Sequence, residues 1–587
     1  MARIVVDPVT RIEGHLRIEA QVDGGVVSDA WSSGTMFRGI ELILRGRDPR
    51  EAWIWAQRIC GVCTMVHALA SVNAVEDALS IEVPDNARLI RNIIAATQTI
   101  QDHVIHFYHL HALDWVDVVS SLKADPAATS KLAQSISDWP LSSTQYFKGV
   151  QDRIRTLAES KQLSLFGSGY WGHPAYHLPP EANLMAVAHY LEALTFQREF
   201  IRIHAVLGGK NPHLQTFLVG GMATAMDPNE PGATINPERM DFLVQVAKSA
   251  QPFVSQVYIP DVLAIAGFYR DWFGRGEGLG NFMSYGGYPQ GSIHDYAAYF
   301  LPRGIILNRD LSKVYPVDPG NITEYVAHSW YQYSRGNQVG LNPYEGETNP
   351  KYTGPKPPYE FLEVDQKYSW LKAPRYDNKA IEVGPLARLL VAYAAGQPDV
   401  KALIDTTLAK LNAPPAALFS TLGRVAARAL ETQLLADRLV GWLEQLRNNM
   451  ATGNLSIFNG EKWDPSSWPQ TARGFGFFEA PRGSLGHWVE IENQTIKNYQ
   501  AVVPSTWNAG PRDPSGQRGA YEAALIKTPI AEPERPLEIL RTVHSFDPCL
   551  ACAVHVVDAR GRPIPVLKQE DEAVRFLGGS ERSETTK

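Results

Sequence analysis

Two periodicities divide this chain into predicted strands and helices. Residues 16–22 alternate apolar and polar side chains, residues 23–25 supply an Asp-Gly-Gly turn, and residues 26–27 resume the apolar pattern. A period of two is typical of a strand with one buried face, and the glycines suit a tight hairpin turn. We therefore predict a β-hairpin within residues 3–30.

Apolar residues at helical spacing dominate the rest of the chain. The glycine of Cys60-Gly61-Val62-Cys63 breaks one such pattern, and a proline pair at 179–180 opens another. We predict helices over residues 39–45, 50–82, 86–118, 181–207 and about 383–448. Residues 268–380 are rich in Gly, Pro, Tyr and Asn, and we expect long ordered loops there. The predicted fold class is mainly α with small β elements (α+β).

Composition narrows the range of functions. The chain has 587 residues, of which 44% are hydrophobic and 20% charged, as in ordinary folded proteins. A formal net charge of −7 and the lack of a long Lys/Arg run argue against nucleic acid as the main partner. No apolar run reaches the roughly 18 residues of a membrane helix, and the N-terminus does not have the form of a secretory signal. We expect a soluble subunit without a recognisable targeting signal of its own.

The chain has four cysteines, in two pairs near its opposite ends. The pairs are Cys60 with Cys63 and Cys549 with Cys552, and two residues separate the cysteines of each pair. This spacing lets both sulfurs converge on one ion, and thiolates suit zinc, nickel, copper(I) and iron–sulfur clusters. The economical interpretation is one four-thiolate site that closes when the two ends meet.

Three simpler interpretations of the cysteines remain open at this point. Structural zinc is the commonest use of paired C-x-x-C motifs, but zinc ribbons place their pairs about 15–20 residues apart. A redox C-x-x-C motif needs only one pair, at the start of a helix in a small α/β domain. Two disulfides would be a sparse framework for so long a chain. None of the three accounts for the histidine and the charged residue close to each pair.

Longer blocks surround these cysteines and occur along most of the chain. Together they resemble the large subunit of nickel–iron hydrogenases, closest to the respiratory, membrane-associated, hydrogen-uptake type. The blocks are DPVTRIEGH at 7–15, FRGIE at 37–41, RICGVC at 58–63 followed by His67, EAPRG at 479–483, VVPSTWN at 502–508 and DPCLACAVH at 547–555. The resemblance covers essentially the whole chain, in order. It implies one intertwined domain over 1–555, with a β-rich part at 1–48, a helical core at 49–450 and a site-completing part at 451–555.

The resemblance also implies a set of metals. Nickel would be bound by Cys60, Cys63, Cys549 and Cys552, with Cys63 and Cys552 bridging to an iron that carries carbonyl and cyanide ligands. Heterolytic cleavage of H2 would take place at this pair of metals.

A magnesium ion would lie nearby, bound by Glu41, the backbone carbonyl of Ala501 and His555. Carboxylate and carbonyl oxygens are the ligands that magnesium prefers. From periodicity alone Glu41 would be an exposed helix charge. The resemblance places Pro504 and Ser505 beside the diatomic ligands of iron, with Ser505 as a hydrogen-bond donor.

Proton handling is assigned in the same way. Cys549 or Arg482 would take the first proton and Glu13 would pass it outward, because a carboxylate has a tunable pKa. On residue type alone, Glu13 suggests a surface ion pair and Arg482 an arginine that stabilises a turn. Asp102 and Asp547 complete the predicted catalytic set.

Histidines near these motifs have simpler interpretations beside the implied ones. The resemblance gives His67 a hydrogen bond to the Cys63 sulfur, whereas a satisfied core histidine is the plainer reading. Four more histidines fall close together at positions 103, 106, 109 and 111. They do not share one helix face, so we favour hydrogen bonding or proton movement over a second transition-metal site.

With all four cysteines assigned, none is left for an electron relay. We therefore expect a partner subunit that carries iron–sulfur clusters. The resemblance implies H2 as substrate, a membrane quinone-linked acceptor reached through that partner, and export with it to the periplasmic side of the cytoplasmic membrane. It also implies nickel-insertion proteins and an endopeptidase that cuts between His555 and Val556, removing residues 556–587.

Two other functions stay in competition. One is a hydrogen sensor or a cofactor-reducing hydrogenase subunit with the same site. The other is a non-catalytic scaffold with a structural four-cysteine zinc site. The metal content of the purified protein separates the scaffold from both hydrogenase readings.

Overall fold

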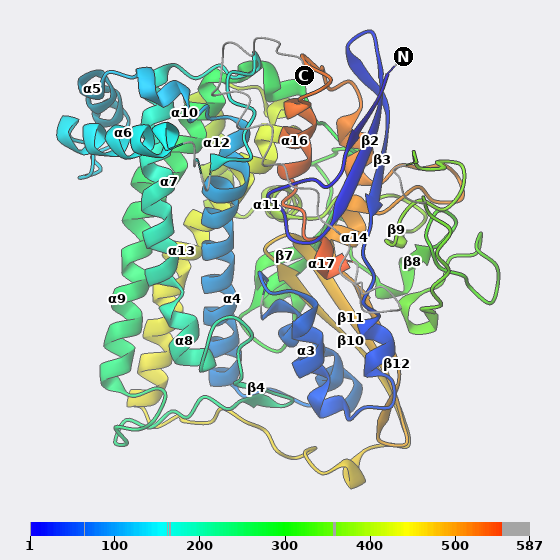
Figure 1. The fold of residues 1–587 in the computed structure, drawn as a ribbon. Helices are drawn as coiled ribbons and strands as arrows, with labels where there is room; N and C mark the ends of the chain where they lie inside the picture. The colour runs from blue at the N-terminus through cyan, green and yellow to red at the C-terminus, as the bar shows by residue number, and fades with distance from the viewer. Residues whose placement is uncertain (1, 64, 161–162, 164–165, 356–359, 554–587) are drawn as a thin grey trace, which may run out of the picture.

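The computed structural model describes residues 2–63, 65–160, 163, 166–355 and 360–553. It shows a mainly helical protein with several small antiparallel sheets, which confirms the predicted fold class (Figure 1). Within these residues, no helix has both the length and the apolar character needed to cross a membrane.

Four long helices form the helical core and lie side by side in Figure 1. They are α4 (Asp85–Ile105), α7 (Pro180–Phe200), α9 (Pro237–Phe253) and α13 (Thr421–Ala451). The start of α13 is capped by Ser420, whose hydroxyl accepts a hydrogen bond from the Gly423 N–H. Proline at the first position of α7 and α9 costs no hydrogen bond there. The predicted helices over 86–118, 181–207 and 383–448 are confirmed in position, although each is interrupted.

The remaining helices are shorter. Those before residue 300 are α1 (Ile40–Leu44), α2 (Ala52–Ala56), α3 (Val66–Leu79), α5 (Pro126–Ile136), α6 (Thr144–Glu159), α8 (Arg202–Gly208) and α10 (Ile259–Phe268). Those after it are α11 (Pro385–Ala394), α12 (Pro398–Leu411), α14 (Pro504–Ala509), α15 (Ala520–Leu525), α16 (Leu537–His544) and α17 (Leu550–Ala553).

The N-terminal sheet has the order β1-β2-β3. Its strands are β1 (Ala2–Val6), β2 (Leu16–Asp23) and β3 (Val26–Gly34), and the turn between β2 and β3 has Gly24 and Gly25 with positive φ. The predicted hairpin is therefore confirmed, and β1 extends it by one strand.

A second three-stranded sheet near the C-terminus positions the first cysteine pair. Its strands, in the order β10-β11-β12, are β10 (Thr471–Ala480), β11 (Gly483–Glu492) and β12 (Thr495–Val502). Helix α3 packs on β10, where a Cβ at Gly476 would lie 2.0 Å from the Ala70 carbonyl oxygen. Only glycine permits this close approach, which fixes the helix that begins just after Cys63.

The prediction of loops over 268–380 needs correction. This region contains the antiparallel pairs β6 (Phe282–Pro289) with β7 (Tyr299–Ile306) and β8 (Ile322–Tyr325) with β9 (Ala373–Tyr376). Glycine and proline within and beside these short strands hide their periodicity, and pairing with a distant partner supplies the stability that local sequence lacks. A further small pair joins β4 (Phe217–Leu218) to β5 (Gly221–Met222).

The largest hydrophobic cluster draws residues from each predicted part of the chain, among them Leu44, Trp442 and Cys549. The division at 48 and 450 stays a prediction, and residues 556–587 lie outside the described residues.

Candidate metal centre

The two ends of the chain meet through backbone contacts. Glu13 and Cys549 form a parallel bridge, and the Leu550 N–H donates to the Glu13 carbonyl at 2.6 Å. Gly14 follows with φ +82°, and a Cβ there would lie 2.2 Å from the Ala551 nitrogen. The guanidinium of Arg38 donates to the carbonyls of Arg58 and Ala551, at 3.2 and 3.1 Å. The expected meeting of the two motifs is thus observed.

Three of the cysteines form one cluster. The sulfurs of Cys60, Cys63 and Cys549 all lie within 4.8 Å of one another, and those of Cys60 and Cys549 are 3.4 Å apart. All three side chains are buried. The backbone N–H groups of Val62 and Cys63 donate to the Cys60 sulfur at 3.3 and 3.2 Å, which favours a thiolate. Cys552 lies in α17, and its side chain is outside the described part of the chain.

Thiolates clustered in this way fit a soft or borderline ion such as nickel, and three soft donors from two distant segments exceed what a disulfide requires. Hard ions such as magnesium and calcium prefer oxygen ligands, so a cluster of thiolates argues against a hard ion at this position. It does not separate nickel from zinc, because both accept four thiolates.

A buried guanidinium lies between two carboxylates at the same place. Arg482 approaches Asp102 at 3.3 Å and Asp547 at 3.0 Å, and all three side chains are buried. Burial opposes the positive charge of Arg482, but Asp547 and the Cys549 thiolate raise the pKa of Arg482 well above its ordinary value. The structure therefore holds a fixed planar cation next to the sulfur cluster.

The two carboxylates differ from ordinary aspartates. Burial raises the pKa of Asp102 to about 8, against the opposing effect of Arg482. Burial likewise raises the pKa of Asp547. Asp547 also has a φ of +57°, a left-handed conformation that non-glycine residues rarely adopt and that concentrates at functional sites.

Glu13 is half-buried beside this group. Burial raises the pKa of Glu13, the Cys60 thiolate raises it further, and Arg482 and Arg38 oppose both effects. Among the described residues Glu13 forms no ion pair, so the surface ion-pair interpretation is not supported. A raised pKa near the sulfurs suits a carboxylate that takes up and releases a proton. Its role in proton transfer stays a prediction.

Ser505 contacts the second cysteine motif directly. Its hydroxyl oxygen accepts a hydrogen bond of 3.0 Å from the Cys549 N–H, so its own proton is available to another acceptor. It follows Pro504 at the start of α14, and both residues are buried. The predicted interaction with diatomic ligands is untested.

Glu41 lies at the start of α1, as predicted, and lines a cavity of about 40 Å³. Its carboxylate accepts from the Ala501 N–H at 3.0 Å and from the Thr348 hydroxyl. The cavity is also lined by Lys372, which pairs with Glu324 at 3.3 Å. Glu41 and Ala501 are therefore adjacent, whereas His555 lies outside the described residues. The magnesium site remains a prediction.

His67 is a buried histidine with a histidine partner. Its Nδ1 lies 3.0 Å from Nε2 of His487, whose Nδ1 is 2.6 Å from the Tyr499 hydroxyl. Burial lowers the pKa of His67 to about 4, so the ring is neutral near pH 7. This supports the reading of a satisfied core histidine, and the bond to the Cys63 sulfur stays a prediction. His487 was not predicted as a partner from the sequence, because only its pairing in β11 turns it toward His67.

The four clustered histidines around the end of α4 have separate partners. The helix continues as a π-helical turn at His106–His111, which rotates successive side chains away from one face. The partners are the Glu431 carboxylate for His103, the His544 carbonyl for His106, the Tyr190 carbonyl for His109 and the Asp114 carboxylate for His111. Hydrogen bonding thus accounts for each of them.

His111 does form a compact group with Asp114 and His544. The Trp115 indole N–H donates to Nε2 of His111, so its other nitrogen carries the proton that reaches Asp114 at 3.0 Å. His544 spans Asp114 at 2.6 Å and the Thr10 carbonyl at 2.8 Å. Because every ring nitrogen is already engaged, the group is a hydrogen-bonded clamp and not a vacant ligand set.

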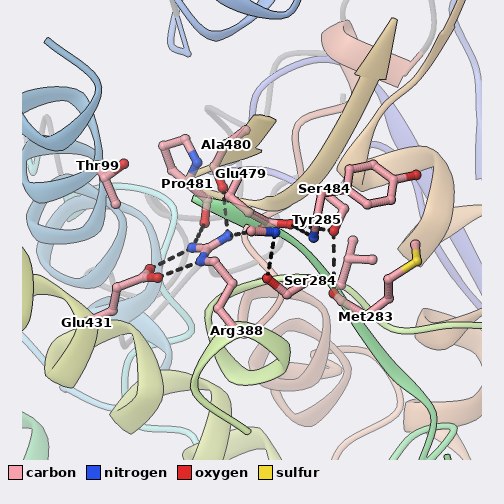
Figure 2. A network of polar contacts seen from close by, with 12 residues as sticks. Thr99, Met283, Ser284, Tyr285, Arg388, Glu431, Glu479, Ala480, Pro481 and Ser484 are labelled. Carbon is pink, nitrogen blue, oxygen red and sulfur yellow. Dashed lines mark hydrogen bonds and ion pairs between the residues drawn. The ribbon is translucent and has the colours of Figure 1, made fainter. Parts of the chain in front are cut away.

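A further network supports the turn that carries Arg482. Figure 2 shows Arg388 at its centre, between the carboxylates of Glu431 and Glu479 and the carbonyls of Ala480 and Pro481. Arg388 and Glu431 were not predicted from the sequence, although a charged residue within an apolar helical pattern is a detectable signal.

Comparison with known proteins agrees with this geometry. A family model described as nickel-dependent hydrogenase matches residues 38–555. This chain belongs to the nickel-dependent hydrogenases. A second model, described as HoxL-like, matches residues 3–32.

Hydrogenases of this family are similar along almost the whole chain. The uptake hydrogenase large subunit of Bradyrhizobium diazoefficiens is 53% identical over 581 residues, covering 96% of this chain and 97% of that one. The hydrogenase-1 large chain of Escherichia coli is 51% identical, covering 95% and 96%. Among solved structures, a [NiFeSe] hydrogenase variant from Desulfovibrio vulgaris Hildenborough superposes with a TM-score of 0.75 at 35% identity, over 94% and 99% of the chains. The chain is therefore a hydrogenase large subunit.

Proposed function

We propose that this subunit oxidises H2 to two protons and two electrons in hydrogen uptake. The observation that carries the proposal is the meeting of Cys60, Cys63 and Cys549 near the Arg482 guanidinium. Two similar proteins, from Bradyrhizobium diazoefficiens and Rhizobium leguminosarum, are named uptake hydrogenase large subunits, which supports the proposal.

Nickel would be held by these three thiolates together with Cys552, and iron by Cys63 and Cys552 with carbonyl and cyanide ligands. When bound, the two metals supply the site that binds H2 and accepts its electrons. The protein supplies the groups that handle the proton. Heterolysis needs a base close to the metals, and the Cys549 thiolate and Arg482 are the two candidates that the geometry offers.

Arg482 differs from a free arginine in how it is restrained. Asp102 and Asp547 bind its guanidinium from two sides, so its orientation needs no rearrangement during the reaction. Because the pKa of Asp102 is about 8, this carboxyl can carry a proton at neutral pH and leave Asp547 as the counter-charge. Glu13, whose pKa burial also raises, would take the proton next and pass it outward.

The electrons must leave through another protein. All four cysteines of the chain are assigned to the metal centre, so no cysteine remains to bind a cluster. We propose an iron–sulfur small subunit as the partner, and through it a membrane quinone-linked acceptor on the periplasmic side of the cytoplasmic membrane. Nε2 of His213 donates a hydrogen bond of 3.0 Å to the Cys60 carbonyl oxygen, and we propose that the turn at 208–213, which carries His213, faces this partner.

We further propose a magnesium ion held by Glu41, the Ala501 carbonyl and His555. We also propose maturation by nickel-insertion proteins and an endopeptidase. The family match ends at residue 555, which supports cleavage between His555 and Val556. An intact mass that includes residues 556–587 in fully active protein would contradict cleavage.

The main proposal is tested by metal analysis and infrared spectroscopy of the protein, purified together with its bound partner proteins. We expect nickel and iron in near-equal amounts in the large subunit, sharp carbonyl and cyanide bands, and H2 uptake with an artificial acceptor. Zinc alone, without such bands in properly matured protein, would instead support a scaffold.

A further inference from the structure

Arg388 is a buried arginine outside the metal centre with every donor used. It lies on α11, is 1% exposed, and has five N–H groups. Two bind the Glu431 carboxylate, at 2.5 and 2.6 Å, and one binds Glu479 at 2.8 Å. The last two bind the backbone carbonyls of Ala480 and Pro481, at 2.8 and 3.1 Å (Figure 2).

Those two carbonyls belong to the residues directly before Arg482. The turn between β10 and β11 is tight, and Gly483 has a φ of +133°. A Cβ at Gly483 would lie 2.7 Å from the nitrogen of Gly384, the N-cap of α11. The start of α11 therefore abuts the turn, and Arg388 secures it by two hydrogen bonds from one rigid guanidinium.

The same network reaches the carboxylate that Arg482 binds. Glu431 lies 2.7 Å from Nε2 of His103, the residue after Asp102 on α4. Burial opposes ionisation of Glu431, but Arg388 lowers the pKa of Glu431 to about 2. The contacts thus form a closed ring. Arg388 binds Glu431, which binds His103 beside Asp102 on α4, and Asp102 binds Arg482, whose preceding carbonyl binds Arg388.

We propose that Arg388 is a positioning residue that aims the Arg482 guanidinium at the thiolate cluster. It touches neither the sulfurs nor the two aspartates in any described contact, and it acts through the backbone of Ala480 and Pro481. Lysine at this position keeps the charge but has three donors on one nitrogen, so it cannot bind two carboxylates and two carbonyls in this plane. The inference rests on the role proposed for Arg482.

A second arginine provides a matched control. Arg91 on α4 binds Glu76 through two nitrogens, at 2.9 and 2.7 Å, and the carbonyls of Leu218 and Gly221, both at 3.0 Å. It is also buried, but the backbone it secures belongs to β4 and β5 and not to the metal centre. A merely structural role for Arg388 predicts the same outcome for lysine at either position.

The test compares Arg388→Lys and Arg91→Lys in the metal-loaded protein purified with its partner subunit. We expect both to retain nickel and iron, and Arg388→Lys to lower kcat for H2 oxidation per nickel by about 10- to 100-fold. Arg91→Lys should stay within about twofold of the wild type. In an Arg482→Lys background, Arg388→Lys should have little further effect, within about twofold, because it acts through Arg482.

Crystal structures of the variants give a readout that does not depend on activity. In Arg388→Lys we expect the Arg482 guanidinium to leave hydrogen-bonding distance of Asp102 or Asp547, and in Arg91→Lys to keep both contacts. Should Arg388→Lys fail to fold, Glu431→Gln takes its place, because it removes the carboxylate charge that Arg388 binds at nearly constant volume. We then expect a smaller loss of kcat for H2 oxidation, measured with and without Arg482→Lys.

An unmoved Arg482, equal losses in both lysine variants, or an undiminished effect in the Arg482→Lys background would overturn the inference. Absence of H2 oxidation in nickel-loaded wild type would instead overturn the proposed function, and the crystallographic comparison would still decide the role of Arg388.

Discussion

The thiolates and the guanidinium of the metal centre are positioned in different ways. Cys60 and Cys63 lie on one turn, where backbone N–H groups point at the Cys60 sulfur. Arg482 instead binds Asp102, 380 residues away in the chain, and Asp547. The first cysteine pair is therefore positioned by a local motif, whereas Cys549 and the Arg482 guanidinium reach it through long-range contacts.

The difference follows from the cost of burying charge. An unpaired buried guanidinium is strongly unfavourable, so its partners must be brought to it by the fold. A cysteine thiol is small and apolar enough to be buried without a partner, and it acquires its charge with the metal. We therefore expect substitution of a cysteine to abolish metal binding, and substitution of Arg482 to leave the metals bound.

Cys60→Ser has the largest expected effect. Its sulfur lies 3.4 Å from that of Cys549, and a serine hydroxyl is a poor ligand for a soft ion. We expect nickel content and H2 oxidation to fall to background, as measured by elemental analysis and an H2 uptake assay. A variant with wild-type nickel content would show that Cys60 is not a ligand.

Arg482→Lys tests the opposite side. A lysine has one nitrogen in place of the two that bind Asp102 and Asp547, so the planar, preorganised cation is lost while the thiolates are untouched. We expect both metals to remain and H2 oxidation per nickel to fall by about 100- to 1000-fold. Arg375→Lys is the matched control, because Arg375 is fully buried and pairs with Asp513 at 2.7 Å. Loss of nickel in Arg482→Lys would break the proposed separation of the two sides.

Glu13→Gln should affect proton transfer alone. The amide keeps the size of the carboxyl group but cannot release a proton at neutral pH, so exchange of H2 with solvent deuterium should slow by about 100-fold or more. Glu192→Gln controls for an altered half-buried carboxylate, since burial also raises the pKa of Glu192. Exchange at the wild-type rate, with both metals present, would show that the relay assignment is wrong.

Asp102→Asn tests a pH dependence of stability. Burial raises the pKa of Asp102 from 3.8 to about 8, so the folded protein keeps a proton that the unfolded chain releases. The contribution of this proton to stability is complete below about pH 4 and is lost as the pH rises to about 8. The melting temperature of the wild type minus that of Asp102→Asn should therefore decrease over this range and level off above it. A difference that does not change with pH would contradict the raised pKa.

Local patterns explain why much of the architecture was predictable. The hairpin in β2 and β3, the start of α3 after the first cysteine pair, and α7 after its prolines each depend on neighbours in sequence. The strands β6 to β9 were missed, because short strands interrupted by glycine are stabilised by pairing and not by their own pattern. Arg388 and Glu431 were missed for a related reason, since the burial of each charge is explained only by its ion pair with the other.

The sequence by itself determined the chemistry available to this protein. Four cysteines in two pairs, set within long characteristic blocks, predicted the donor atoms and identified the family. Only the tertiary structure decided which charges face those donors, that Asp102 has a pKa of about 8, and that α11 and α13 support the turn of Arg482. Residue types and short spacings can be read directly from the sequence. Burial and long-range electrostatic interactions arise only when distant segments have packed together.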